Sequence, residues 1–202
     1  MLLSGICFAF LHFFSYPNPV DSVLAFNNLH TPTLDFIFKY LTKLGEEIGI
    51  IAVVLVFAIK KEWRWLVSTA VTFTSVIAIS SICKHYFFTF KDRPRTVLHD
   101  DKLIHFVQGV EIHLYNSFPS GHTITAVTCC TLLALYFAKH AGLQVAFAIF
   151  AIMVALSRVY LFQHFFIDIA TSIFLSLFVT IAIELLMSNW INQTHKTLNE
   201  TI

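Results

Sequence analysis

Long apolar segments separated by short polar ones make up most of this chain. Four of them have lengths of about 17–25 residues, which an α-helix needs to cross a bilayer. These four segments are residues 66–83, 122–138, 143–161 and 165–187. A fifth, residues 48–59, reaches that length only with the amphipathic stretch that begins at Leu34. The pattern predicts an all-α, polytopic membrane protein.

The N-terminal apolar stretch, residues 2–16, is shorter than a full span. At about 1.5 Å per residue it covers about 22 Å as a helix, and Pro17 and Pro19 end it. A cleaved signal peptide is disfavoured, because no Lys or Arg precedes the apolar run. The stretch is either a short first helix or a helix partly in the membrane interface. We therefore expect a six-transmembrane-helix bundle whose first helix is short or partial.

Composition agrees with a membrane protein and limits the partners. Apolar residues make up 57% of the chain and charged residues 12%, about half the charged fraction of a typical soluble domain. A length of 202 residues fits a single domain, residues 1–202. The net charge of +1 gives no sign of a nucleic-acid partner. The spacing of the cysteines fits no zinc site, and we interpret them as small apolar residues within helices.

Basic residues between the spans indicate how the chain lies in the membrane. Lys60, Lys61 and Arg64 cluster between the second and third spans, which places that loop and both termini in the cytoplasm. The opposite side carries even more positive charge. Its basic residues are Lys84, Lys91, Arg93, Arg95, Lys102 and Arg158. Either the orientation is reversed, or these residues are there for another reason.

Three short segments on that second side hold nearly all of the unusual polar residues. They are residues 84–95, 119–122 and 157–168. The third predicted helix ends at the first segment and the fourth begins at the second, while the fifth and sixth meet at the third segment. Polar groups that are far apart in the sequence therefore converge on one membrane surface.

His164 and Asp168 lie four residues apart at the start of the last span, and hence on one face of a helix. An Asp just inside an apolar span is costly and usually functional, although a structural cap is an alternative. A carboxylate against one imidazole nitrogen fixes the tautomer and leaves the other nitrogen nucleophilic. The pair therefore predicts a nucleophile, His164, with an orienting partner, Asp168.

The tetrapeptide Pro-Ser-Gly-His, residues 119–122, has the form of a loop that leads into a helix. The simplest interpretation of Ser120 is a helix cap. Gly121, however, allows close backbone approach, and free N–H groups at a helix N-terminus bind phosphate oxygens. His122 is then placed to protonate a leaving oxygen.

Positive charge comes from the first segment and from Arg158. Arg93 precedes Pro94, which gives a guanidinium on a stiffened turn suited to bidentate contact with phosphate. Lys84 supplies a second point charge. Each of these bases, taken alone, is also explained as facing lipid headgroups, and Arg158 as a snorkelling anchor. Together they are able to neutralise a phosphate dianion.

The three segments resemble the signature of the type 2 phosphatidic acid phosphatase family. Its members share Lys-x6-Arg-Pro, then Pro-Ser-Gly-His, then Ser-Arg-x5-His-x3-Asp. The second motif is intact at residues 119–122 and the third at residues 157–168. In the first motif, eight residues separate Lys84 from Arg93, and the expected position is Tyr86. Either Lys84 reaches the phosphate through a longer turn or Lys91 takes its role. We choose Lys84, because it ends a helix as the family lysine does.

The resemblance implies a metal-independent phosphatase that needs no cofactor and works in two steps. His164 attacks phosphorus to form a phosphohistidine while His122 protonates the departing oxygen, and His122 then acts as base for the hydrolytic water. Asp168 orients His164. The implied phosphate-binding residues are Lys84, Arg93, Ser120, Gly121 and Arg158. We expect a lipid substrate in the bilayer, and a bacterial inner membrane with the site facing the periplasm or the exterior.

Small bacterial members of that family act on phosphatidate, phosphatidylglycerophosphate, undecaprenyl diphosphate or lipid A, and the choice among these stays open. Residues 95–117 form the loop that we expect to discriminate among them. Its acidic and histidine residues suggest a metal site, but their spacing fits no ligand pattern, and we interpret the loop as wet and facing the headgroups. These residues are His99, Asp100, Asp101, His105, Glu111 and His113.

Two other functions are compatible with part of the pattern. A phosphotransferase on the same scaffold would pass the phosphoryl group from His164 to another lipid instead of water. A non-enzymatic lipid carrier would explain the hydrophobicity, but neither the pairing of His164 with Asp168 nor Gly121 beside His122. Inverted repeats or helices broken by Gly or Pro would favour a carrier, and the sequence has none that we recognise.

Overall fold

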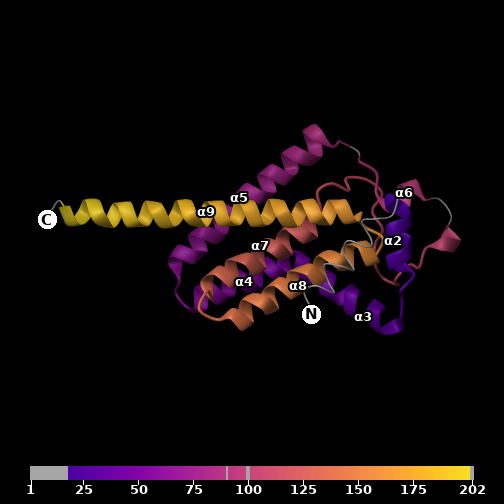
Figure 1. Cartoon of the computed structure of the whole chain (residues 1–202), viewed down its shortest axis with the longest axis horizontal. Coiled ribbons are helices and arrows are strands. Elements are labelled where there is room, and N and C mark those ends of the chain that lie inside the picture. Colours follow the sequence, from indigo (N-terminus) through magenta and orange to yellow (C-terminus); the bar gives the residue numbers. More distant parts are fainter. Residues whose placement is uncertain (1–17, 90, 99–100, 201–202) are drawn as a thin grey trace.

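The computed structural model describes residues 18–89, 91–98 and 101–200, and it is built of helices (Figure 1). No strand occurs in these ranges, and the predicted all-α class is confirmed. Residues 2–16 lie outside them, so the first helix stays a prediction. In chain order the elements are α2 (Pro19–Asn27), α3 (Pro32–Leu41), the 3₁₀ turn η1 (Thr42–Gly45), α4 (Glu47–Ile59), α5 (Trp63–Ile82), the π turn η2 (Cys83–Phe87), α6 (Pro94–Val97), the 3₁₀ turn η3 (Asp101–Leu103), α7 (Gly121–Tyr136), α8 (Ala141–Tyr160) and α9 (Phe166–Glu200).

Five apolar helices correspond to the five spans that hydropathy predicts. Among the described residues, three are long and apolar enough to cross a membrane: Trp63–Phe87, Ala141–Tyr160 and Phe166–Asn189. The helices α4 and α7 are apolar but shorter. Large apolar side chains, such as Leu55 on α4 and Phe174 on α9, are exposed on the outside of the bundle. This pattern suits a chain whose helices face lipid, because apolar side chains need no shelter there.

One predicted span, residues 34–59, is wrong as a single helix. The helices α3 and α4 are joined by η1, which is followed by the extended residue Glu46 (φ −104°, ψ −159°). Close packing explains the break. A Cβ atom on Gly45 would lie 2.8 Å from the His122 carbonyl oxygen and 3.0 Å from Val154 Cγ1. Only a residue without a side chain lets η1 approach α7 and α8 this closely.

Two apolar clusters hold the helices together. The first joins α4, α5, α7 and α9 around buried side chains that include Phe57, Val76 and Leu132. The second joins α2 to α8 and α9 around Val23 and Phe162. Figure 1 shows α2 lying across the end of the bundle where α8 turns into α9. The second cluster therefore fixes the geometry of that end.

The longest helix, α9, carries polar groups at two distant levels. Asp168 lies in its first turn, and Glu184 lies sixteen residues further on, about 24 Å away along the helix axis at about 1.5 Å per residue. At the second level, Arg64 Nη2 lies 2.9 Å from Glu184 Oε2 and 2.9 Å from Ser188 Oγ. Ser68 donates a hydrogen bond to the same carboxylate. All members of this charged group therefore find their partners on α5 and α9.

Candidate active site

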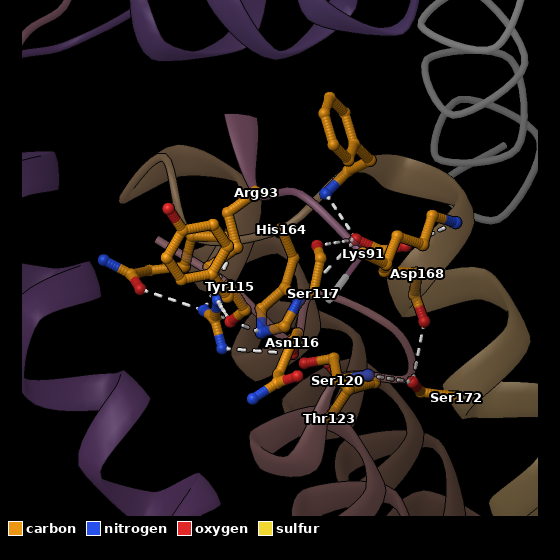
Figure 2. Close-up of polar contacts among 12 residues, drawn as sticks. Lys91, Arg93, Tyr115, Asn116, Ser117, Ser120, Thr123, His164, Asp168 and Ser172 are labelled. Carbon is orange, nitrogen blue, oxygen red and sulfur yellow. Dashed lines mark hydrogen bonds and ion pairs between the residues drawn. The ribbon is translucent and has the colours of Figure 1, made fainter. Parts of the chain in front are cut away.

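The three polar segments predicted from the sequence meet at the end of the bundle that α2 covers (Figure 1). Residues from the α5–α7 connection, from the start of α7 and from the α8–α9 turn contact one another there. Figure 2 shows this meeting point, with Arg93, Ser120, His164 and Asp168 drawn from different elements. The predicted convergence of sequence-distant polar groups is therefore present in the fold.

His164 occupies the turn between α8 and α9 and is almost completely buried, with 2% of its surface exposed. Its Nδ1 atom faces Asp168 Oδ2 at 3.7 Å, and its Nε2 atom lies 3.4 Å from Arg93 Nη1 (Figure 2). Burial lowers the pKa of His164 to about 3, and Asp168 only partly opposes this effect. The imidazole is therefore neutral at physiological pH, and one nitrogen keeps a free lone pair.

Asp168 is fully buried in the first turn of α9, and several groups fix its orientation. Its Oδ2 atom accepts hydrogen bonds from Ser117 Oγ and from the Phe165 backbone N–H at 3.0 Å. Its Oδ1 atom lies 3.6 Å from Lys91 Nζ. The carboxylate is thus held in one position, from which it faces His164.

The two candidate lysines lie in different surroundings. The ammonium of Lys91 faces Asp168 and stands 4.6 Å from the centroid of the Phe118 ring. Lys84 belongs to the π turn η2, and its Nζ atom lies 3.9 Å from the point where a Cβ on Gly121 would stand. The fold therefore brings Lys84 against Gly121 and Lys91 against Asp168.

The wide turn η2 also accounts for the longer spacing of the first motif. The Phe88 N–H donates to the Cys83 carbonyl oxygen at 2.8 Å, a hydrogen bond between residues five apart instead of four. A π turn accommodates one more residue than an α-helical turn. Part of the additional length between Lys84 and Arg93 is therefore taken up at the end of α5.

Ser120 immediately precedes α7, but its side chain does not cap that helix. Its backbone N–H donates to Ser172 Oγ at 2.8 Å, and its Oγ accepts from Thr123 Oγ1 at 3.0 Å. The hydroxyl hydrogen of Ser120 is therefore available for another acceptor. The first backbone N–H groups of α7, including those of Gly121 and His122, have no partner within the helix. This is the arrangement that binds phosphate oxygens.

Arg93 and Arg158 are both buried, with 8% and 4% of their surfaces exposed. Arg93 donates to the backbone carbonyls of Tyr115 (2.8 Å) and Gln163 (3.1 Å) and to the Gln163 side chain. Burial lowers the pKa of Arg93 to about 10, with a partial offset from Asp168, so the guanidinium stays charged at neutral pH.

Arg158 reaches inward instead of snorkelling toward the headgroups. Its Nη1 atom donates to Thr42 Oγ1 at 2.7 Å, while its Nε atom is buried and has no hydrogen-bond partner within the described part of the chain. Across the same ranges, neither Arg158 nor Arg93 forms an ion pair with a carboxylate. Two buried positive charges without a paired carboxylate make this a favourable place for an anion.

His122 lies in the first turn of α7, and its Nε2 atom is 3.1 Å from Glu46 Oε1. Beside it is a cavity of about 480 Å³, which Lys84 and Gly121 also line. The cavity continues between apolar residues of α4 and α5, including Ile50 and Ile77. It therefore joins the polar site to the lipid-facing helices.

Sequence reasoning missed several residues that shape the site. Gln163 bridges Arg93 and the loop, since its side chain also donates to the Glu111 carbonyl at 3.0 Å. Ser117 holds Asp168, and Glu46 contacts His122. Glu46 alone had a usable signal, because a carboxylate inside a predicted span is costly and marks a functional position.

The loop at residues 95–117, predicted to be wet and headgroup-facing, is partly anchored to the bundle. His105 Nε2 lies 2.8 Å from Asp35 Oδ2 on α3, and the His105 backbone N–H donates to Asn27 Oδ1 at 2.8 Å. No group of three or more His, Cys, Asp or Glu side chains is arranged around a common metal position in the described ranges, which leave out His99 and Asp100.

Comparison with known protein families identifies one of them. The sequence profile of the PAP2 superfamily matches residues 65–192, more than half of the chain. Two solved structures share the fold. LpxE of Aquifex aeolicus has a TM-score of 0.64 at 20% identity, with 81% of this chain and 92% of that chain covered.

The second structure is described as the first transmembrane PAP2-type phosphatidylglycerolphosphate phosphatase of Bacillus subtilis. It has a TM-score of 0.64 at 19% identity, with 90% of this chain and 94% of that chain covered. No curated protein sequence matches this chain significantly. At these identities the structural similarity establishes the fold alone. The family match is a separate observation.

Proposed function

This chain belongs to the PAP2 superfamily, and on that premise we propose that it removes phosphate from a membrane lipid by attack of His164 on phosphorus. The resemblance read from the motifs is confirmed by the family match. The chain is accordingly a membrane lipid phosphatase, a phosphoric ester hydrolase. The roles of individual residues, the covalent step and the choice of substrate are our proposal.

The first step transfers the phosphoryl group to the protein. The lone pair of His164 Nε2 attacks phosphorus, the bond to the lipid oxygen breaks, and His122 gives its proton to that oxygen. Asp168 faces the opposite nitrogen of His164 at 3.7 Å and stabilises the positive charge that the ring acquires. In the second step His122 takes a proton from water, the resulting hydroxide attacks phosphorus, and the bond to His164 breaks.

The observation that carries this proposal is the unbalanced charge around a neutral imidazole. Arg93 and Arg158 are buried without a paired carboxylate, next to His164. A phosphate dianion would supply the missing negative charge, and the charge that develops on its oxygens in the transition state would be stabilised further. Lys84, Ser120 and Gly121 complete the proposed phosphate site.

The substrate class follows from where the site lies. A phosphate at the end of a bundle with exposed apolar helices suits a phosphate monoester or diphosphate whose apolar part stays in the bilayer. We place the protein in a bacterial cell membrane, with the site on the periplasmic or outer side. Phosphatidate, phosphatidylglycerophosphate, undecaprenyl diphosphate and lipid A form the panel for a phosphate-release assay.

A trapping experiment tests the covalent step directly. Purified protein in detergent, mixed with ³²P-labelled phosphatidate in excess chelator and quenched in alkali, is expected to carry acid-labile label. His164→Ala should carry none and release no phosphate while it still folds. Turnover in that variant would refute the mechanism. Dependence of wild-type turnover on added zinc or magnesium would contradict its metal-independent form, and a requirement for an acceptor lipid would make the protein a phosphotransferase.

A further inference from the structure

Glu46 forms a second carboxylate–imidazole contact in the site, separate from that of Asp168 and His164. Its Oε1 atom lies 3.1 Å from His122 Nε2. A carboxylate only accepts hydrogen bonds, so this contact requires a hydrogen on Nε2. His122 also lines the cavity that Lys84 and Gly121 line. His122 therefore lies at that cavity with Nε2 as a hydrogen-bond donor.

The position of Glu46 is set by backbone packing. The break between η1 and α4 rests against the first turn of α7, where a Cβ on Gly45 would come within 3.0 Å of His122 Cβ. Glu46 is the extended residue that immediately follows. Its side chain is 41% exposed and lines the cavity, so the carboxylate is able to yield to an incoming ligand oxygen.

Burial of His122, and then the charges around it, oppose the form that an acid catalyst needs. Positively charged or titratable groups that act on it are Arg158, His164, Arg93 and His113. Lys84 lines the same cavity. Glu46 and Glu47 are the carboxylates among the residues that line it. Since like charges disfavour a proton on the ring and a carboxylate favours it, Glu46 counteracts the phosphate-binding cations at His122.

We propose that Glu46 is a positioning residue that keeps His122 oriented and protonated as the general acid, an inference that rests on the proposed function. In the free enzyme Glu46 accepts the hydrogen bond from Nε2–H. When a lipid phosphate binds, the leaving oxygen takes the place of Glu46 as acceptor and receives the proton as its bond to phosphorus breaks. The hydrolytic water later returns a proton to His122, so Glu46 exchanges none.

Leaving-group dependence separates this role from a structural one. An alkoxide leaving group such as that of phosphatidate needs a proton, whereas p-nitrophenolate leaves with little help from an acid. We expect Glu46→Gln to lower kcat/KM for phosphatidate by about 10²-fold at pH 8. The same variant should hydrolyse p-nitrophenyl phosphate within about threefold of the wild type, since phosphate binding and His164 are intact.

The pH profile gives a second readout with a matched control. Glu46→Gln should move the basic limb of kcat/KM for phosphatidate to lower pH, because His122 loses its proton more readily. Glu47→Gln removes the same charge from the next residue, which makes no hydrogen bond to His122, and should move that limb less. Glu46→Asp keeps a carboxylate further from the ring and should fall between Glu46→Gln and the wild type.

The outcomes are distinguishable. Equal losses on both substrates with an unshifted pH profile would refute the role of Glu46, as would wild-type behaviour of Glu46→Gln. If Glu46→Gln does not fold in detergent, the comparison of Glu46→Asp with Glu47→Gln decides the same question. Failure of the wild type to release phosphate from either compound would overturn the proposed function instead.

Discussion

Two groups of charged side chains lie at opposite levels of α9, and they differ in how their charge is balanced. At the level of Glu184, Arg64 is paired with this carboxylate at 2.9 Å. Serine hydroxyls from α5 and α9 complete the hydrogen bonds. At the site, Arg93 and Arg158 are more deeply buried, yet they have no paired carboxylate in the described ranges. The paired group joins α5 to α9, whereas the unpaired group suits an anionic ligand.

The largest expected effect comes from removing an unpaired charge. Arg158→Met should lower phosphate release from lipid by about 10²–10³-fold, because a preorganised donor to the developing charge is lost. Stability should be unchanged or slightly higher, since a buried charge without a carboxylate partner is replaced by an apolar group. Phosphate-release kinetics and the unfolding temperature in detergent measure the two quantities.

Inorganic phosphate supplies the control for Arg158→Met. It should raise the unfolding temperature of the wild type, because it binds only the folded state, and have a smaller effect on the variant. Marked destabilisation of Arg158→Met without phosphate would mean that this arginine is paired inside the protein after all.

The paired group should respond in the opposite way. Glu184→Leu leaves Arg64 without its acid and should reduce the free energy of unfolding by about 1–3 kcal/mol. Phosphate release per folded molecule should stay at the wild-type level, since Glu184 lies about 24 Å from Asp168 along the helix axis. Denaturant titration in detergent and activity per folded molecule give the two values.

A double variant completes this test. Arg64→Met together with Glu184→Leu should recover most of the lost stability, because replacing both partners of an ion pair is much less costly than removing one. A parallel loss of activity in either variant would show that the two levels of α9 are coupled.

The smallest effect concerns the proton affinity of His164. Its pKa in the folded protein is about 3, below the ordinary value of 6.5. Between these values the unfolded state binds a proton that the folded state does not, so stability falls as the pH drops below about 6.5. This one side chain contributes a slope of up to about 1.4 kcal/mol per pH unit.

His164→Asn should lack that contribution and show a flatter decline in unfolding temperature between about pH 6 and pH 5. Parallel curves for the two proteins would mean that solvent or an acidic partner already lets His164 take up a proton in the folded state.

Much of the fold was predictable because a bilayer imposes a simple rule on the sequence. Each helix that faces lipid must be apolar over most of its length, and that pattern located three helices of spanning length and two shorter apolar helices. The break at Gly45 escaped prediction, because its cause is contact with His122 and Val154 from other helices. Hydropathy along one segment carries no information about such a contact.

The same distinction holds in the site. His164, Asp168 and the Pro-Ser-Gly-His segment have short, fixed spacings, so the sequence alone predicted that they belong together. Gln163 and Ser117 act through partners 70 and 51 residues away, which no local pattern relates to them. Their roles in holding Arg93 and Asp168 become visible only when the α5–α7 connection is seen folded against the α8–α9 turn.

The π turn at Cys83–Phe87 has a consequence for how such enzymes are recognised. The ammonium of Lys84 lies beside Gly121 although eight residues, instead of six, separate it from Arg93. A helix end that widens can absorb an insertion without moving a side chain at its start. A search pattern that allows only six residues between the lysine and the arginine would pass over this chain. The geometry tolerates a variable gap, and the search pattern should allow one too.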